Sequence, residues 1–304
     1  MTVTPIIDST LMFVRIWITQ LGIGLPDSGG AYSAAGDILD RIADAMAVKL
    51  TNSGWEGLAA NASAAQGVEQ WNSVTGLERI DQQVAAIIAV QADLIMATRK
   101  NLAQIETYLR EMKRVAESLF STGQVAEAKA CEWTATGKAT TGMNRAMATL
   151  NNVTAQHVSA IFGANQQLQA LLAALISEGT PTQGEAMSAV NSESTGTLKR
   201  AASIFRVDLM SLKDVAAFCA VTKRWLAAPE VVAAGVSQRV GQTHGSCTAA
   251  FTNELQMFEI RRAEVIQKLR DDLAVRASLL EWTATNIELT DEETAALFQE
   301  AGTI

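Results

Sequence analysis

Apolar residues recur at intervals of three or four over two long stretches of this chain, from about residue 56 to 119 and from about 125 to 177. This spacing puts the apolar side chains on one face of an α-helix, and many repeats of it form a seam that a second helix can cover. Ser121-Thr122-Gly123 separates the stretches, so we expect two long helices packed antiparallel across a short turn. Because about 50 helical residues span about 75 Å, the sequence predicts an elongated all-α bundle.

Shorter helices are expected on both sides of this pair. Asp8 is expected to cap a helix that ends near Gln20, and the glycines and proline of 21–30 predict a loop. A helix over 29–50 then leads to Trp55, which we expect in a tight turn. Residues 72–76 are expected to kink or break the first long helix. In the C-terminal part the pattern predicts helices over 209–227, 247–287 and 291–299, with a capping box at Ser211 and Asp214. A helix end is expected before Pro229, followed by either a loop or a frayed helix over 230–245.

The best candidate for a linker is the region 178–203. It opens with Glu178-Gly179-Thr180-Pro181 and continues rich in serine and threonine. We therefore expect a helical module over 1–177, a linker over 178–203 and a second helical module over 204–304.

Charge and composition exclude several classes of function. The net charge of −8 and the pI near 5.0 disfavour a nucleic-acid groove and electrostatic binding to a membrane surface. No run of 18 apolar residues occurs, so no membrane span is predicted; membrane association of another kind is left open but not predicted from the sequence. The N-terminus lacks the basic region of a general secretory signal. The cysteines Cys131, Cys219 and Cys247 form no CxxC pair, which excludes a zinc site and a disulfide framework, but a thiol could still cross-link two copies.

The patterns that carry catalysis are absent from the sequence. There is no Glu-x-x-His pair, Gly-x-Ser-x-Gly elbow or P-loop. His157 lies on an apolar seam, where we interpret it as a core residue, and His244 is expected to cap a helix or fill a turn. The acidic residues 288–293 are interpreted as charges at a helix N-terminus. We predict no enzyme activity, no cofactor and no metal.

Two groups of segments resemble known families. Segments of the N-terminal part resemble the start of EspA and its relatives, type VII (ESX) secretion-associated proteins of mycobacteria and other actinobacteria; they are Pro5-Ile6-Ile7-Asp8, residues 21–30 and Gly54-Trp55-Glu56-Gly57. Segments of the C-terminal part resemble EspC, the small partner secreted with EspA; they are Val207-Asp208, Thr243-His244-Gly245, Phe251, Asn253-Glu254-Leu255 and Leu297-Phe298. The chain thus resembles an EspA-like module fused to an EspC-like module.

The resemblance implies that the two helical hairpins pair inside the chain, as the partners do in PE/PPE-type pairs. It also implies a composite export signal, with Trp55 and Gly57 in a Trp-x-Gly turn as one half. The other half in this family is Tyr-x-x-x-Asp after the last bundle helix, and the C-terminal part of this chain has no tyrosine. The favoured substitute is Trp282 with Asn286, which keeps an aromatic face; the alternative is Ile287-x-x-x-Asp291, which keeps the acid.

These features favour a secreted substrate or accessory protein of a type VII system, which would act by protein–protein interaction and self-assembly at the cell envelope. The expected partners are the export ATPase of the secretion machinery, other ESX substrates and further copies of the chain. The expected location is secreted or at the cell surface after synthesis in the cytoplasm. The alternatives are a structural filament or ring component, a cytoplasmic chaperone-like adaptor for ESX substrates, and a helical-bundle enzyme.

Overall fold

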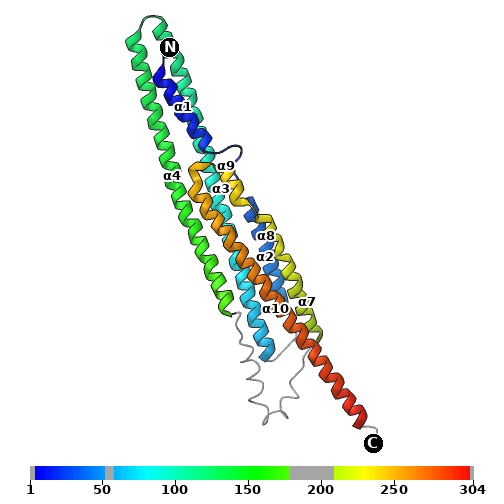
Figure 1. Cartoon of the computed structure of the whole chain (residues 1–304). Helices are drawn as coiled ribbons and strands as arrows, with labels where there is room; N and C mark the ends of the chain where they lie inside the picture. The colour runs from blue at the N-terminus through cyan, green and yellow to red at the C-terminus, as the bar shows by residue number, and fades with distance from the viewer. Residues whose placement is uncertain (1–3, 52–57, 179–208, 302–304) are drawn as a thin grey trace. The chain divides into compact units, whose positions relative to one another are not determined.

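The structure of the chain, a computed structural model, describes residues 4–51, 58–178 and 209–301 (Figure 1). Side chains are described within the narrower ranges 4–49, 63–177 and 212–286. All regular structure in the described residues is helical, which confirms the predicted all-α bundle. The helices are α1 (Pro5–Gln20), α2 (Gly30–Thr51), α3 (Leu58–Ser121), α4 (Val125–Glu178), α7 (Leu209–Trp225), α8 (Ala227–Ala233), α9 (Val236–His244), the 3-10 turn η1 (Ser246–Thr248) and α10 (Ala249–Ala301).

The two long helices are confirmed, with ends within two residues of those expected. The turn between α3 and α4 contains Gly123 with a φ of +81°, a conformation that glycine adopts without the strain of a side chain. The seam also holds polar residues that are buried and bonded. Gln91 donates from Nε2 to Thr154 Oγ1 at 3.0 Å, and His157 Nδ1 lies 2.6 Å from Gln91 Oε1. His157 is therefore a seam residue with a bonded partner, as its position predicted.

The expectation that Asp8 caps the first helix is wrong. Helix α1 begins three residues earlier with Pro5 in its first turn, where the missing N–H of proline is not needed. Asp8 lies inside that turn and pairs with Lys113 Nζ at 2.6 Å.

The N-terminus of α1 is instead satisfied by a residue from α4. The buried carboxylate of Glu132 accepts hydrogen bonds from the backbone N–H groups of Ile6 at 3.2 Å and Ile7 at 3.4 Å. A negative charge there also complements the positive end of the helix dipole. Glu132 thus fixes α1 against the long helices.

Helix α3 continues through residues 72–76, so the expected break is wrong, while the alternative of a kink there stays a prediction. Ser73 and Val74 are buried, and a Cβ at Gly76 would lie 3.3 Å from Leu171 of α4. Packing of the two helices therefore overrides the weak local helix propensity of this segment.

The expected helix end before Pro229 is confirmed, because α7 ends at Trp225. Pro229 itself is the third residue of the next helix, α8, a position that tolerates proline. The segment 230–245 is mostly helical, with α8 and α9 separated at Gly235, whose φ is +70°.

Two corrections concern the starts of the C-terminal helices. Ser211 lies inside α7, which begins at Leu209, so it does not occupy a capping position. Helix α10 continues through Ala301, so the predicted separate helix over 291–299 is its last part, and the acidic residues near Asp291 are not at a helix N-terminus.

The chain forms two compact units. Unit 1 comprises residues 1–31, 83–165 and 235–260, and unit 2 comprises 32–82, 166–234 and 261–304. Each unit contains residues from both sides of 178–203. The predicted N-terminal and C-terminal modules therefore contact each other inside each unit.

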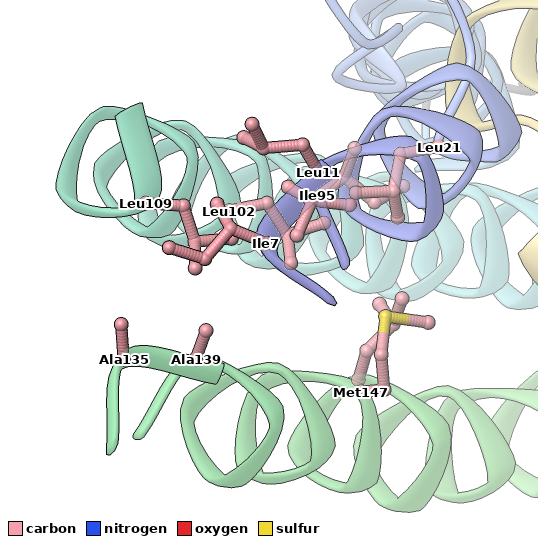
Figure 2. Close-up of a cluster of buried hydrophobic side chains, with 11 residues drawn as sticks. Ile7, Leu11, Leu21, Ile95, Leu102, Leu109, Ala135, Ala139 and Met147 are labelled. Carbon is pink, nitrogen blue, oxygen red and sulfur yellow. The ribbon is translucent and has the colours of Figure 1, made fainter. Parts of the chain in front are cut away.

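The core of unit 1 is built where α1 lies against the long helices (Figure 2). On α3 the buried residues Ile95, Leu102 and Leu109 follow at intervals of seven. The small Ala135 and Ala139 on α4 leave space for larger side chains. Each fully buried leucine or isoleucine stabilises the fold by about 1.5–3 kcal/mol. The α1 side chains in this core are Ile7, Leu11, Val14 and, just past the helix end, Leu21.

The core of unit 2 joins five helices. Its largest fully buried side chain is Tyr32, at the start of α2. Other buried side chains there are Leu39 and Ile42 from α2, Leu77 and Ile80 from α3, Leu168 from α4, Leu212 from α7, and Leu269 and Leu273 from α10.

Candidate functional site

In unit 1 the loop after α1 meets the end of α9 at very short range. A Cβ at Gly22 would lie 2.6 Å from the carbonyl oxygen of Thr243, and a Cβ at Gly245 would overlap the carbonyl of Gln20. Both glycines also have positive φ, +84° and +77°. Only glycine fits at either position, because the two backbones touch.

Arg99 on α3 holds this junction together through backbone carbonyls. Its guanidinium donates to Leu21 O at 2.7 Å, to Thr243 O at 2.6 Å and to Gly24 O. The carbonyl of Thr243 belongs to the last turn of α9, so the cation also complements the negative end of that helix. Burial lowers the pKa of Arg99, which nevertheless stays charged near neutral pH.

A second set of contacts at the junction comes from Asp27. Its Oδ2 pairs with Arg239 Nε at 2.9 Å, and its backbone N–H donates to Thr243 Oγ1 at 3.1 Å. The Oδ1 atom accepts from the N–H of Gly29 at 2.9 Å, which shapes the loop before α2. The loop 21–29 is therefore bonded to α9 by side chains from both partners.

His244 lies under the junction and is completely buried. Its ring stacks on Phe251 with centroids 6.3 Å apart and planes at 23°. Its Nε2 has no hydrogen-bond partner among the described residues. Burial lowers the pKa of His244 to about 4; the charge of Arg99 acts in the same direction and that of Asp27 opposes it. The residue ends α9 and is neutral near pH 7.

Unit 2 contains a buried ion pair between α3 and α10. Arg262 donates from Nη2 and Nε to the Asp81 carboxylate at 2.6 and 2.7 Å, and its guanidinium lies 5.7 Å from the centre of the Tyr32 ring. The two side chains are 4% and 0% exposed, so the pair is removed from water. Burial raises the pKa of Asp81, and the charge and hydrogen bonds of Arg262 oppose that shift. Arg262 also donates to Pro229 O at 3.2 Å, which connects α8 to the pair.

Arg276 makes the next contact along the same two helices. Its Nη1 bonds Gln70 Oε1 at 2.9 Å and its Nη2 bonds the carbonyl of Ser63 at 2.6 Å. Contacts thus move toward the start of α3 as α10 advances, so the helices run antiparallel. Trp282 is six residues beyond Arg276, about 9 Å along α10, and Leu58 is five residues before Ser63, about 7.5 Å along α3. The register therefore brings Trp282 level with the first turn of α3.

Of the predicted export residues, the structure describes those on α10. Trp282 is 67% exposed, and Asn286 donates from Nδ2 to the Trp282 carbonyl at 2.9 Å. Asp291 belongs to the same helix, but its side chain lies outside the described residues. Trp55 and Gly57 also lie outside the described residues, as does most of the predicted linker 178–203. The roles of these residues stay predictions.

The three cysteines are free thiols and none is paired with another. Cys219 is buried, whereas Cys131 and Cys247 are half-buried. Burial raises the pKa of Cys219 and of Cys247, which lowers the fraction of reactive thiolate. The intermolecular cross-link through a thiol stays a prediction.

The described residues also bear on whether the chain holds a metal site or a membrane-spanning helix. Within the described ranges, no group of three or more His, Cys, Asp or Glu side chains is placed to hold a metal ion. One helical stretch, Ser63–Ser121, is long and apolar enough to cross a membrane by length and composition, and 44% of its most apolar window is buried inside the structure. A core helix can pass the same test, so this is weak evidence for a span.

Comparison with known proteins finds matches in two separate stretches of the chain. A model of the EspA/EspE family matches residues 21–104, and a model described as excreted virulence factor EspC, type VII ESX diderm, matches residues 206–300. The chain thus carries a segment similar to the EspA/EspE family followed by a segment similar to EspC. The EspA-like match contains Arg99, Asp27 and Asp81, and the EspC-like match contains their partners Thr243, Arg239 and Arg262. These contacts therefore pair the modules within one chain.

The similarity to individual relatives is partial. The chain is 28% identical over 114 residues to the ESX-1 secretion-associated protein EspA of Mycobacterium tuberculosis, in strains CDC 1551 / Oshkosh and ATCC 25618 / H37Rv. The match covers 38% of this chain and 29% of EspA. No solved structure matches the chain.

Proposed function

We propose that this chain is a substrate of a type VII (ESX) secretion system, exported with its EspA-like and EspC-like modules already paired. After export it acts at the cell envelope by binding other proteins and further copies of itself, not by catalysis. The observation that carries the proposal is the presence of both ESX-associated matches in one chain, with polar contacts joining them at two junctions.

Fusion makes this pairing intramolecular. A tethered partner has an effective concentration of about millimolar, so the modules pair without the search that separate proteins need. The ion pair of Asp81 and Arg262 and the clamp of Arg99 give the pairing one register. A folded pair could therefore form before the chain meets the secretion machinery.

The second half of the export signal is proposed to be Trp282 with Asn286. The side chain of Trp282 is exposed on α10, where an aromatic face is free for a docking partner. The antiparallel register puts it level with the first turn of α3, which follows Gly57 directly in the sequence. Both parts of the signal would then be offered to the export ATPase at one end of α3.

Fractionation of an actinobacterial strain with an active ESX system tests the proposal. We expect the parent protein in the culture filtrate or cell envelope, and cytoplasmic retention of Trp55→Ala and Trp282→Ala. Trp133→Ala is the matched control, because Trp133 is equally exposed at 67% but lies on α4, outside both family matches. Parent protein found only in the cytoplasm would refute export and favour the adaptor alternative. Export of Trp282→Ala at the parent level would refute the role of that side chain.

A further inference from the structure

One face of α4 in unit 1 carries a large exposed aromatic side chain beside a hollow. Trp133 is 67% exposed, although a tryptophan offers a large apolar area for burial. Its side chain forms one wall of a hollow with a volume of about 480 Å³. The other lining residues are Thr134, Gly137, Lys138, Thr141, Gly142 and Arg145. The aromatic ring and an unfilled space thus share one helix face.

One glycine that lines the hollow is not required by packing inside the chain. A Cβ at Gly137 would meet no atom within 4 Å, whereas a Cβ at Gly142 would meet Ile105 Cδ1 at 3.1 Å. Internal packing therefore accounts for Gly142 but not for Gly137. Glycine inside a helix is less favourable than alanine, so an open position such as Gly137 suits a group that approaches from outside the chain.

The charges at the hollow suit the aromatic ring next to it. Lys138 and Arg145 line the space, and within the described ranges neither forms an ion pair. The electron-rich face of a tryptophan attracts such cations. The same surface therefore carries both an aromatic side chain and the cationic hollow that would bind one, which is the self-complementarity that a two-fold interface needs.

We propose that this face of α4 binds a second copy of the chain, with Trp133 of each copy in the hollow of the other. Suppose that the two α4 helices run antiparallel and that Gly137 of each copy faces Lys138 of the other. Trp133, four residues before Gly137, then faces Gly142, four residues after Lys138, in the other copy. Both contacts form together, and each ring lies between a lysine and an arginine. The proposal deepens and rests on the self-association part of the proposed function; it does not depend on export.

Sedimentation velocity of the purified full chain under reducing conditions, over a wide range of concentrations, tests this interface. We expect a monomer–dimer equilibrium. Trp133→Ala and Gly137→Leu should each weaken it at least about 30-fold, the loss typical of a central interface residue. Gly137→Leu fills the hollow without a clash at its Cβ and should unfold no more easily than the parent.

Two controls make the test specific. Gly163→Leu introduces the same change on the same helix, also where a Cβ meets nothing within 4 Å, and should leave the dimer intact. Trp282→Ala removes an equally exposed tryptophan on α10 and should also leave it intact. A chain that stays monomeric throughout, a dimer unaffected by both Trp133→Ala and Gly137→Leu, or species that grow without limit with concentration would each overturn the two-fold arrangement. Because Trp282 is the test residue for export and Trp133 for association, failure of one proposal is distinguishable from failure of the other.

Discussion

Removal of the Asp81 carboxylate should be among the most damaging single changes to this fold. The side chains of Asp81 and Arg262 are 0% and 4% exposed, so Asp81→Ala leaves a guanidinium buried without its counter-charge. Breaking a buried pair in this way costs about 3–5 kcal/mol. A second route gives a similar figure, because two charge-assisted hydrogen bonds at 2.6 and 2.7 Å are lost at about 1.5–3 kcal/mol each. We expect the lower half of this range, since Arg262 keeps its bond to Pro229.

Urea denaturation followed by far-UV circular dichroism measures this free energy of unfolding. Arg262→Ala should cost a similar amount, and the double variant should cost much less than the sum of the two single changes. The matched control is Asp272→Ala, which breaks the partly exposed pair with Lys268 on the same helix and should cost about 0.5 kcal/mol. A loss below about 1 kcal/mol for Asp81→Ala would mean that the pair is not desolvated, and the reasoning would fail.

Three further variants test contacts within unit 1. His244 has a pKa of about 4 in the folded state and about 6.5 in the unfolded state, so the folded state binds fewer protons between these pH values. The free energy of unfolding should therefore fall by about 3 kcal/mol as the pH drops from above 6.5 to 4. Urea denaturation of His244→Gln should lack most of this loss, whereas the control His157→Gln should keep it. Gly22→Ala should lower the free energy of unfolding by at least about 2 kcal/mol more than Gly24→Ala does in the same assay. Both glycines have positive φ, but only a Cβ at Gly22 would meet backbone atoms. Glu132→Ala should cost about 1–3 kcal/mol and speed hydrogen exchange in α1, since the buried N–H of Ile7 and the partly buried N–H of Ile6 lose their acceptor. Unchanged exchange would contradict its capping role.

The long helices could be predicted because each carries many repeats of one pattern. Over α3 and α4 the apolar spacing is repeated so often that single polar residues such as Gln91 do not obscure it. Shorter elements could not be placed as well, since one residue decides each of them. Pro229, for example, follows the end of α7 and is also the third residue of α8, and the sequence pattern indicated only the first of these.

The paired side chains of the two junctions were not predictable for a different reason. Asp81 and Arg262 lie 181 positions apart, and each alone has the composition of a solvated helix face. A charge beside the apolar Ile80 could have indicated a buried position for Asp81, but not its partner. Arg99 bonds backbone carbonyls, which no sequence pattern identifies. By contrast, the motif Thr243-His244-Gly245 was found by resemblance, and its Gly245 proved to be a point of backbone contact.

The buried pair of Asp81 and Arg262 has a genetic consequence when both residues belong to one polypeptide. The two modules are always made in a one-to-one ratio, and a separately encoded EspC-like protein would have to compete with a tethered one. A damaging change at Arg262 could therefore be rescued only by a second change in the same gene, such as one at Asp81. Suppressor screens should accordingly return intragenic revertants across this junction and very few in other genes.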